Sequence, residues 1–308
     1  MAPSEALRVV DVNQIKCIHF GCVAIFSSTK LINALVEFRP FTTMREVKVN
    51  QWHELSQFLF FKRYFTDQIA INRELLEGFM LSIGWHKCST KSEPFGIYRS
   101  LQKIEDAKDE WQNQGANLSL VGCILGQSFQ YFGDKLFQKI QTCYKSLRVP
   151  SFNQVNYEAN ISTNQGAFEL ASPLPFTLNV LNPFPHLDKD ASLYALGLWV
   201  QADKQTGHIQ KDASKLCTGG KLVFPNEHFW IYLSECQGLI KVVWAISTFF
   251  HYNDPAQDNK SMTLVGMSAQ CSRSSTKKMW QKSNGYYEIE KRACYHVRES
   301  NKISSQLK

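Results

Sequence analysis

"GGKLVFPNEHFWIYLSECQGLIKVVWAISTFFHYN", residues 219–253, is the stretch that decides the fold. It contains three apolar runs, "KLVFP", "FWIYL" and "IKVVWAIS", which are separated by short polar turns. Runs of about five to eight residues between frequent turns predict antiparallel strands and not alternating strands and helices. The same texture begins after Pro150, in "FTLNVL" and "LYALGLWV". We therefore predict an antiparallel sandwich or barrel for residues 151–285.

The part of the chain before Pro150 is richer in helical patterns. Short strands are expected between residues 15 and 49, and an aromatic-rich helix over residues 52–64. The segment "NRELLEGFMLSIGW" predicts a second helix that runs into Gly84. Between residues 126 and 148, apolar side chains recur at steps of three and four, which indicates an amphipathic helix. The fold class is therefore α+β, with a helix-rich buttress packed against a β-rich half.

These patterns divide the chain into three parts. Residues 16–285 are predicted to form one domain, in which residues 16–150 are the buttress and residues 151–285 the β core. Residues 1–15 are expected to be flexible, and residues 286–308 form a basic C-terminal tail. The 308 residues are enough for one large domain or two modest ones.

The composition is that of a globular protein, with 44% hydrophobic and 20% charged residues. No apolar run approaches the roughly 20 residues that span a bilayer, so no membrane contact is expected. The first residues lack the apolar core of a secretory signal. The nine cysteines form no CxxC pair, which argues against a zinc ribbon or a disulfide framework and favours reduced thiols inside a cell.

The net charge of +7 is unevenly distributed. Residues 271–308 contain nine Lys and Arg against three Asp and Glu, and aromatic residues are interleaved among them. Such a segment is suited to neutralising phosphates and stacking on bases, but it is also typical of a solvated extension.

A possible metal site lies in "PFPHLDKDAS", residues 183–192. In an extended chain His186 and Asp188 point to the same side, so that an imidazole and a carboxylate lie together. Two histidines and one carboxylate with open positions are typical of non-haem Fe(II) oxygenases. Of the downstream histidines, His208 and His228 lie in predicted turns. His251 ends a long apolar strand, predicted over residues 239–253, and is the preferred third ligand, although the three residues are also compatible with an ordinary turn and two unrelated histidines.

Taken together, several blocks in this order resemble the fungal Tet-like 2-oxoglutarate/Fe(II) oxygenase family, which is related to the TET and JBP enzymes. The resemblance runs from about residue 20 to residue 280. The blocks are "SIGWHKCS", "FGIYRS", "VPSFNQVNY", "PFPHLDKDAS", "GLWVQADKQTGHI", "GGKLVFPNEHFWIYL", "LIKVVWAISTFFHYN" and "LVGMSAQCS".

The resemblance implies a double-stranded β-helix, or jelly-roll, buttressed by the N-terminal helices. It also implies that His186, Asp188 and His251 are the iron ligands and the catalytic centre, with Fe(II), 2-oxoglutarate and O2 as cofactor and co-substrates. The far carboxylate of 2-oxoglutarate is best bound by an Arg fork. Relatives carry an Arg where this chain has Leu264. Lys260 and Arg273 are the nearest substitutes for binding the co-substrate.

TET and JBP relatives oxidise the 5-methyl group of pyrimidine bases, as in DNA demethylation of 5-methylcytosine. The expected function is therefore hydroxylation of such a methyl group in methylated DNA, with a nuclear rather than cytoplasmic location. Two alternatives remain: a catalytically degenerate jelly-roll that binds DNA or protein, for which Leu264 argues, and an oxygenase of proteins or small molecules. The sequence does not determine the oligomeric state.

Overall fold

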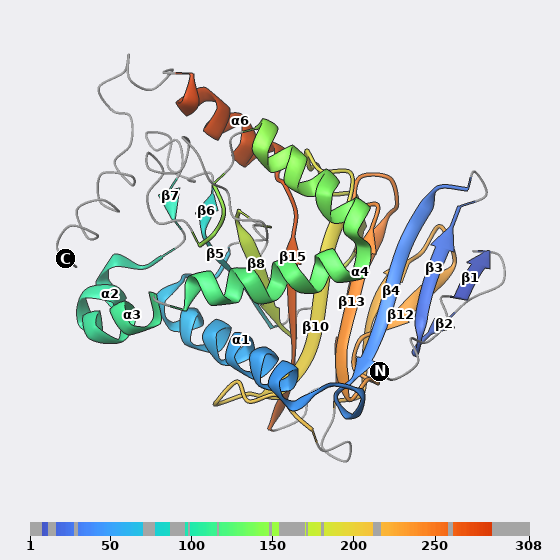
Figure 1. The fold of residues 1–308 in the computed structure, drawn as a ribbon, viewed down its shortest axis with the longest axis horizontal. Helices are drawn as coiled ribbons and strands as arrows, with labels where there is room; N and C mark the ends of the chain where they lie inside the picture. Colours follow the sequence, from blue (N-terminus) through green and yellow to red (C-terminus); the bar gives the residue numbers. More distant parts are fainter. Residues whose placement is uncertain are drawn as a thin grey trace.

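The computed structural model describes residues 8–11, 17–27, 30–69, 78–86, 96–97, 99–115, 117–147, 150–153, 170, 172–179, 182–211, 217–257 and 261–284. Two β-sheets pack against each other, and helices cover the outer face of the larger sheet (Figure 1).

The larger sheet has eight strands in the order β1-β3-β4-β13-β10-β15-β8-β5. The bounds of these strands, in that order, are Arg8–Asp11, Cys22–Phe26, Ile32–Pro40, Gly238–Trp244, Ala195–Asp203, Met262–Ala269, Leu174–Leu178 and Phe79–Ile83.

The smaller sheet has five strands in the order β2-β12-β11-β14-β9. Their bounds are Cys17–Ile18, Phe229–Tyr232, Gly219–Phe224, His251–Ala256 and Asn182–His186. A separate pair is formed by β6 and β7, at Trp85–His86 and Gly96–Ile97.

From β8 onward the chain alternates between the two sheets, except that the consecutive strands β11 and β12 form a hairpin in the smaller sheet. β8, β10, β13 and β15 lie in the larger sheet, while β9, β11, β12 and β14 lie in the smaller one. Within each sheet, the neighbours in these two sets of four strands pair antiparallel. This alternation is the double-stranded β-helix, so the predicted α+β fold class with a jelly-roll core is confirmed.

Two long helices, α1 at Glu46–Phe65 and α4 at Leu118–Ser146, lie across the larger sheet (Figure 1). The shorter helices are η2 at Phe41–Thr43, α2 at Leu101–Asp106, α3 at Lys108–Gly115 and α6 at Arg273–Ser283. The helices bury one face of the sheet, and the second sheet buries the other. The two-residue period of β15 shows this division: Val265 and Met267 belong to the helix-side core, whereas Met262 and Leu264 face the other sheet.

Two local predictions differ from the structure. Phe79–Ile83 is strand β5, paired with β8, and not part of a helix, while residues 70–77 lie outside the described part. Residues 239–253 are not one strand: β13 ends at Trp244, and the Thr248 and Phe249 N–H groups donate to the Ala245 carbonyl in a turn before β14. Arg8–Asp11 pairs parallel with β3.

No helix in the described ranges is long and apolar enough to cross a bilayer. The domain limits stay predictions, because the tail at residues 286–308 lies outside the described residues.

Candidate metal centre

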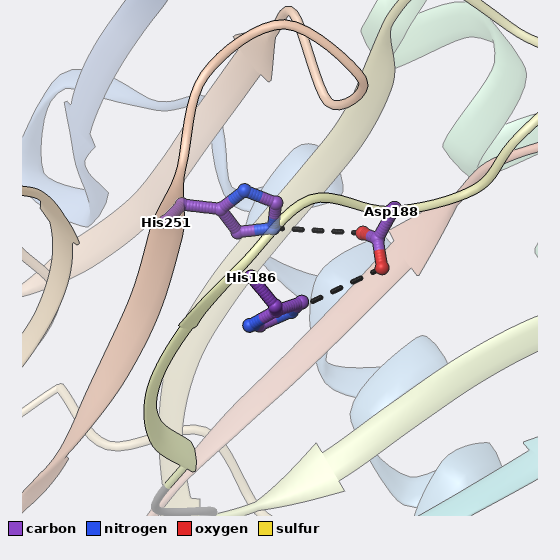
Figure 2. A group of neighbouring side chains, drawn as sticks. All are labelled: His186, Asp188 and His251. Carbon is purple, nitrogen blue, oxygen red and sulfur yellow. Dashed lines mark ion pairs between the residues drawn. The ribbon is translucent and has the colours of Figure 1, made fainter. Parts of the chain in front are cut away.

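The three predicted ligands meet where two strands of the smaller sheet lie side by side. His186 is the last residue of β9 and His251 is the first of β14, and these two residues are paired in the sheet. Asp188 follows β9, and its N–H donates to the carbonyl of Ile246 in the turn before β14. One ligand atom from each of the three side chains lies within 4.8 Å of the others (Figure 2).

Both imidazoles face the same carboxylate. Nε2 of His251 lies 3.5 Å from Oδ2 of Asp188, and Nε2 of His186 lies 3.9 Å from Oδ1 (Figure 2). These distances exceed those of ordinary hydrogen bonds. The three groups therefore converge without closing on one another, as ligands around a common ion do.

Hydrogen bonds to the backbone set the direction of each imidazole. Nδ1 of His186 lies 2.9 Å from the carbonyl oxygen of Phe184, and Nδ1 of His251 lies 3.1 Å from that of Phe249. Because a carbonyl oxygen only accepts, each Nδ1 carries the hydrogen. In the neutral imidazole this places the lone pair on Nε2, which points toward Asp188 and is the atom available to bind a metal.

The site is closed on one side and open on the other. His251 is 4% exposed, and the ring of Trp244 packs edge-on against it at a centroid distance of 5.7 Å. The His186 side chain is 36% exposed and that of Asp188 is 27% exposed. The centre is therefore accessible from the side of His186 and Asp188.

Asp190 is buried in the loop that follows β9 and carries Asp188, which we call the ligand loop. Its burial, and secondarily the charge of Asp188, raise the pKa of its carboxyl to about 7. Arg273, the first residue of α6, donates from Nε to the Asp190 carbonyl at 2.8 Å. The Arg273 side chain is thus held against the loop that carries Asp188, and it does not line the cavity into which we expected it to reach.

A cavity of about 130 Å³ lies between the two sheets beside the three ligands. Besides the ligands, it is lined by Met80, Pro175, Thr177, Trp199, Leu222, Trp244, Asn253, Gly266, Met267, Ser268 and Gln270. None of these described lining residues carries a positive charge. Lys260, predicted to bind the co-substrate, lies outside the described residues.

The polar groups in this cavity are not among the residues predicted from the sequence. Oδ1 of Asn253 and Nε1 of Trp244 are buried and have no hydrogen-bond partner within the described part of the chain. Asn253 was detectable in principle, since it follows His251 by two residues in a strand and so shares its face. Trp244 was not, because its position depends on where β13 ends.

The other two histidine candidates lie elsewhere. The ring of His208 packs against that of His53, with centroids 4.4 Å apart. His228 occupies a turn at a φ of 57° between β11 and β12. Among the described residues, only His186, Asp188 and His251 form a group of three that is arranged to hold a metal ion.

Comparison with known proteins assigns a family. The family model described as the Tet-like 2OG-Fe(II) oxygenase superfamily matches residues 45–256, more than half of the chain. This range includes all three of the converging side chains. No curated protein matches the chain.

Several solved structures are similar at low identity. NgTET1 in complex with 5mC DNA is 11% identical, with a TM-score of 0.45, covering 88% of this chain and 84% of that one. AtDAO1, the dioxygenase for auxin oxidation 1 from Arabidopsis thaliana, bound to 2-oxoglutarate, is 9% identical, with a TM-score of 0.33 and coverages of 87% and 93%. JOX2 in complex with 2OG, Fe and JA is 9% identical, with a TM-score of 0.32 and coverages of 89% and 78%.

Proposed function

The chain belongs to the Tet-like 2OG-Fe(II) oxygenase superfamily, and on this basis we propose that it oxidises the methyl group of a 5-methylpyrimidine base in nucleic acid, with His186, Asp188 and His251 as the iron ligands. Membership makes it a dioxygenase that uses Fe(II) and 2-oxoglutarate. The base would be 5-methylcytosine in methylated DNA, and the reaction would be a step of DNA demethylation.

The donor set fits Fe(II). Two imidazole nitrogens with free lone pairs and one carboxylate provide three ligands on one side of an ion, and leave the remaining positions open. When bound, the iron supplies the oxidising chemistry of the reaction. The chain's own residues hold the ligands in place: the Phe184 and Phe249 carbonyls orient the rings, and the buried wall around His251 excludes water.

The observation that carries the nucleic-acid proposal is the position of α6. Its sequence, "RSSTKKMWQKS", contains four basic residues and no acidic one. The helix starts at the ligand loop, because Ser272 pairs with Asp190 and the Ala191 N–H donates to the Cys271 carbonyl. Arg273 and Lys277 are exposed, and Trp280 is 56% exposed. A cationic helix with an exposed aromatic ring beside the metal centre matches the chemistry of a nucleic-acid backbone and its bases.

Two exposed aromatic rings add to this surface. Phe184, two residues before His186, is 54% exposed, and Phe250, next to His251, is 38% exposed. Exposed rings beside a reaction centre are suited to stacking on bases, including the neighbours of a base that has left the duplex. Action on genomic DNA would place the protein in the nucleus. The fungal branch of the family stays a prediction from the sequence blocks alone.

The test is a turnover assay with defined DNA. The protein is incubated with Fe(II), 2-oxoglutarate, O2 and duplexes that differ only in 5-methylcytosine, and the nucleosides and succinate are quantified by mass spectrometry. We expect oxidised 5-methylcytosine, and more succinate with the methylated duplex. Succinate at equal rates with both duplexes, without an oxidised base, would refute the nucleic-acid substrate while leaving the enzyme class intact.

A further inference from the structure

The sequence resemblance implies an arginine at the position that Leu264 occupies. The Leu264 side chain is 6% exposed and belongs to the apolar core between the two sheets, together with Leu222, Ala256 and Met262. Its Cδ2 atom lies 3.2 Å from the point where a Cβ on Gly220 would be. The part of the β15 face around Leu264 is therefore packed with hydrocarbon.

Two basic side chains of the larger sheet and of α6 that the structure describes have partners outside the cavity. Lys241 on β13 is buried but forms an ion pair with Glu37 and lies 5.0 Å from the ring centroid of Phe132, which belongs to the helix side. Arg273 is bound to the Asp190 carbonyl. Neither of them lines the cavity between the sheets.

Uncharged hydrogen-bond groups occupy the cavity instead. Asn253 pairs with Leu222 in the sheet and lines the cavity on the same face of β14 as His251, about 7 Å further along the strand. An extended five-carbon diacid bound to an ion at His251 spans that length. Oδ1 of Asn253 is buried without a partner in the described ranges. The oxygen and nitrogen of an amide are interchangeable by rotation, so this side chain can present N–H groups to a carboxylate.

We propose that this chain binds the far carboxylate of 2-oxoglutarate through uncharged donors, of which the Asn253 amide is the principal one. Trp244 contributes its Nε1–H, which is also buried without an acceptor among the described residues and lies in the same cavity. The inference rests on the proposed iron ligands and does not depend on which base is oxidised.

Uncharged donors predict only a small difference in affinity between 2-oxoglutarate and an analogue that lacks the far carboxylate. A hydrogen bond from a neutral donor to a carboxylate is worth less than a bidentate guanidinium pair. The wild-type chain should therefore bind 2-oxoglutarate only on the order of tenfold more tightly than 2-oxobutyrate, whose tail is uncharged.

The test measures co-substrate binding and not turnover. Mn(II) replaces Fe(II), and 2-oxoglutarate and 2-oxobutyrate are titrated by calorimetry into Mn(II)-loaded wild-type protein and three variants. N253L replaces the amide with an apolar side chain that has the same number of heavy atoms and the same branching. N33L makes the same change at Asn33, another buried asparagine, which does not line the cavity. K260M removes the charge predicted from the sequence. The Kd of Mn(II) is measured for every protein.

We expect N253L to raise the Kd of 2-oxoglutarate on the order of tenfold and to leave that of 2-oxobutyrate unchanged. N33L and K260M should change neither value. An unchanged Kd in N253L, or a loss in K260M as large as that expected of N253L, would overturn the proposal. A wild-type chain that does not bind Mn(II) would instead refute the iron ligands, so the two failures are distinguishable.

Discussion

Asp188 is the residue on which the metal centre depends most. It lies between two imidazoles whose Nδ1 atoms are already bound to backbone carbonyls, so its two oxygens complete the ligand set. The spacing of two residues between His186 and Asp188 was enough to predict that their side chains lie together, because alternate residues of an extended chain point to the same side. The sequence also predicted that His251 lies at one end of a strand. It did not predict the turn that precedes His251.

A second residue with an unusual environment is Lys62 on α1. It is 2% exposed, and its Nζ atom lies 3.6 Å from the ring centroid of Trp111 in a cation–π contact. Burial lowers the pKa of its ammonium group from 10.5 to about 7. Between these two values the unfolded chain binds more protons than the folded one, so this group makes the protein more stable as pH rises through that window.

We therefore predict that K62M stabilises the protein most at low pH. The gain in free energy of unfolding should be on the order of 2 kcal/mol near pH 6 and should decline between pH 7 and 10.5, where the wild-type amine becomes neutral on folding. Urea unfolding of both proteins across this range provides the measurement. A difference that stays constant with pH would show that Lys62 is not buried as an ammonium group.

At the scale of the elements, the strand faces decide which side chains reach the cavity. Gly197 on β10 lies on the face toward the smaller sheet, two residues before Trp199. A Cβ at Gly197 would lie 2.6 Å from the Trp199 ring and 2.7 Å from the Trp244 ring. The missing side chain is what allows both indoles to line the cavity.

G197A should accordingly displace the two tryptophans. We expect a loss of roughly 1–3 kcal/mol in the free energy of unfolding from overpacking, together with weaker 2-oxoglutarate binding. Chemical unfolding and calorimetry on the Mn(II)-loaded protein measure the two effects. G115A serves as a control, since a Cβ at Gly115 meets no atom within 4 Å. Wild-type stability and binding in G197A would show that the indoles have room to move.

Helix α6 provides the test of the nucleic-acid surface. K277E/K278E should reduce affinity for duplex DNA at least tenfold at low salt and lower the slope of log K against log salt by about 2, one unit for each lost phosphate contact. Gel shifts at several salt concentrations measure both. K135E/K139E makes the same change on α4. An equal loss of DNA affinity in K135E/K139E would show that DNA is attracted by the net charge of the protein and not by a binding surface on α6.

Several elements were predictable because their patterns are local. The antiparallel strands after residue 150 and the amphipathic helix within α4 follow from periodicity alone. Strand β5 was read as a helix because its short run, "FMLSI", follows a helix-like segment, and only pairing with β8 makes it a strand. The turn between β13 and β14 was missed for the same reason, since the apolar run continues through it.

On the scale of the whole molecule, the jelly-roll determines where chemistry is possible. Alternation of the chain between two sheets places the end of β9 and the start of β14 side by side, and the helices seal the opposite face (Figure 1). Asn253 and Trp244 enter the cavity only through this topology, which explains why the sequence predicted the metal ligands but not the polar groups around the co-substrate. The sequence already set Leu264 apart, but its packing in the apolar core between the sheets became known only from the fold.

The most direct test is an anaerobic titration of the apoprotein with Fe(II) and 2-oxoglutarate, followed by the visible charge-transfer absorption of the complex. We predict saturation at one iron per chain in the wild type and in D134A, an exposed aspartate on α4, and no such absorption in D188A. Equal absorption and affinity in D188A, or none in the wild type, would contradict the metal centre.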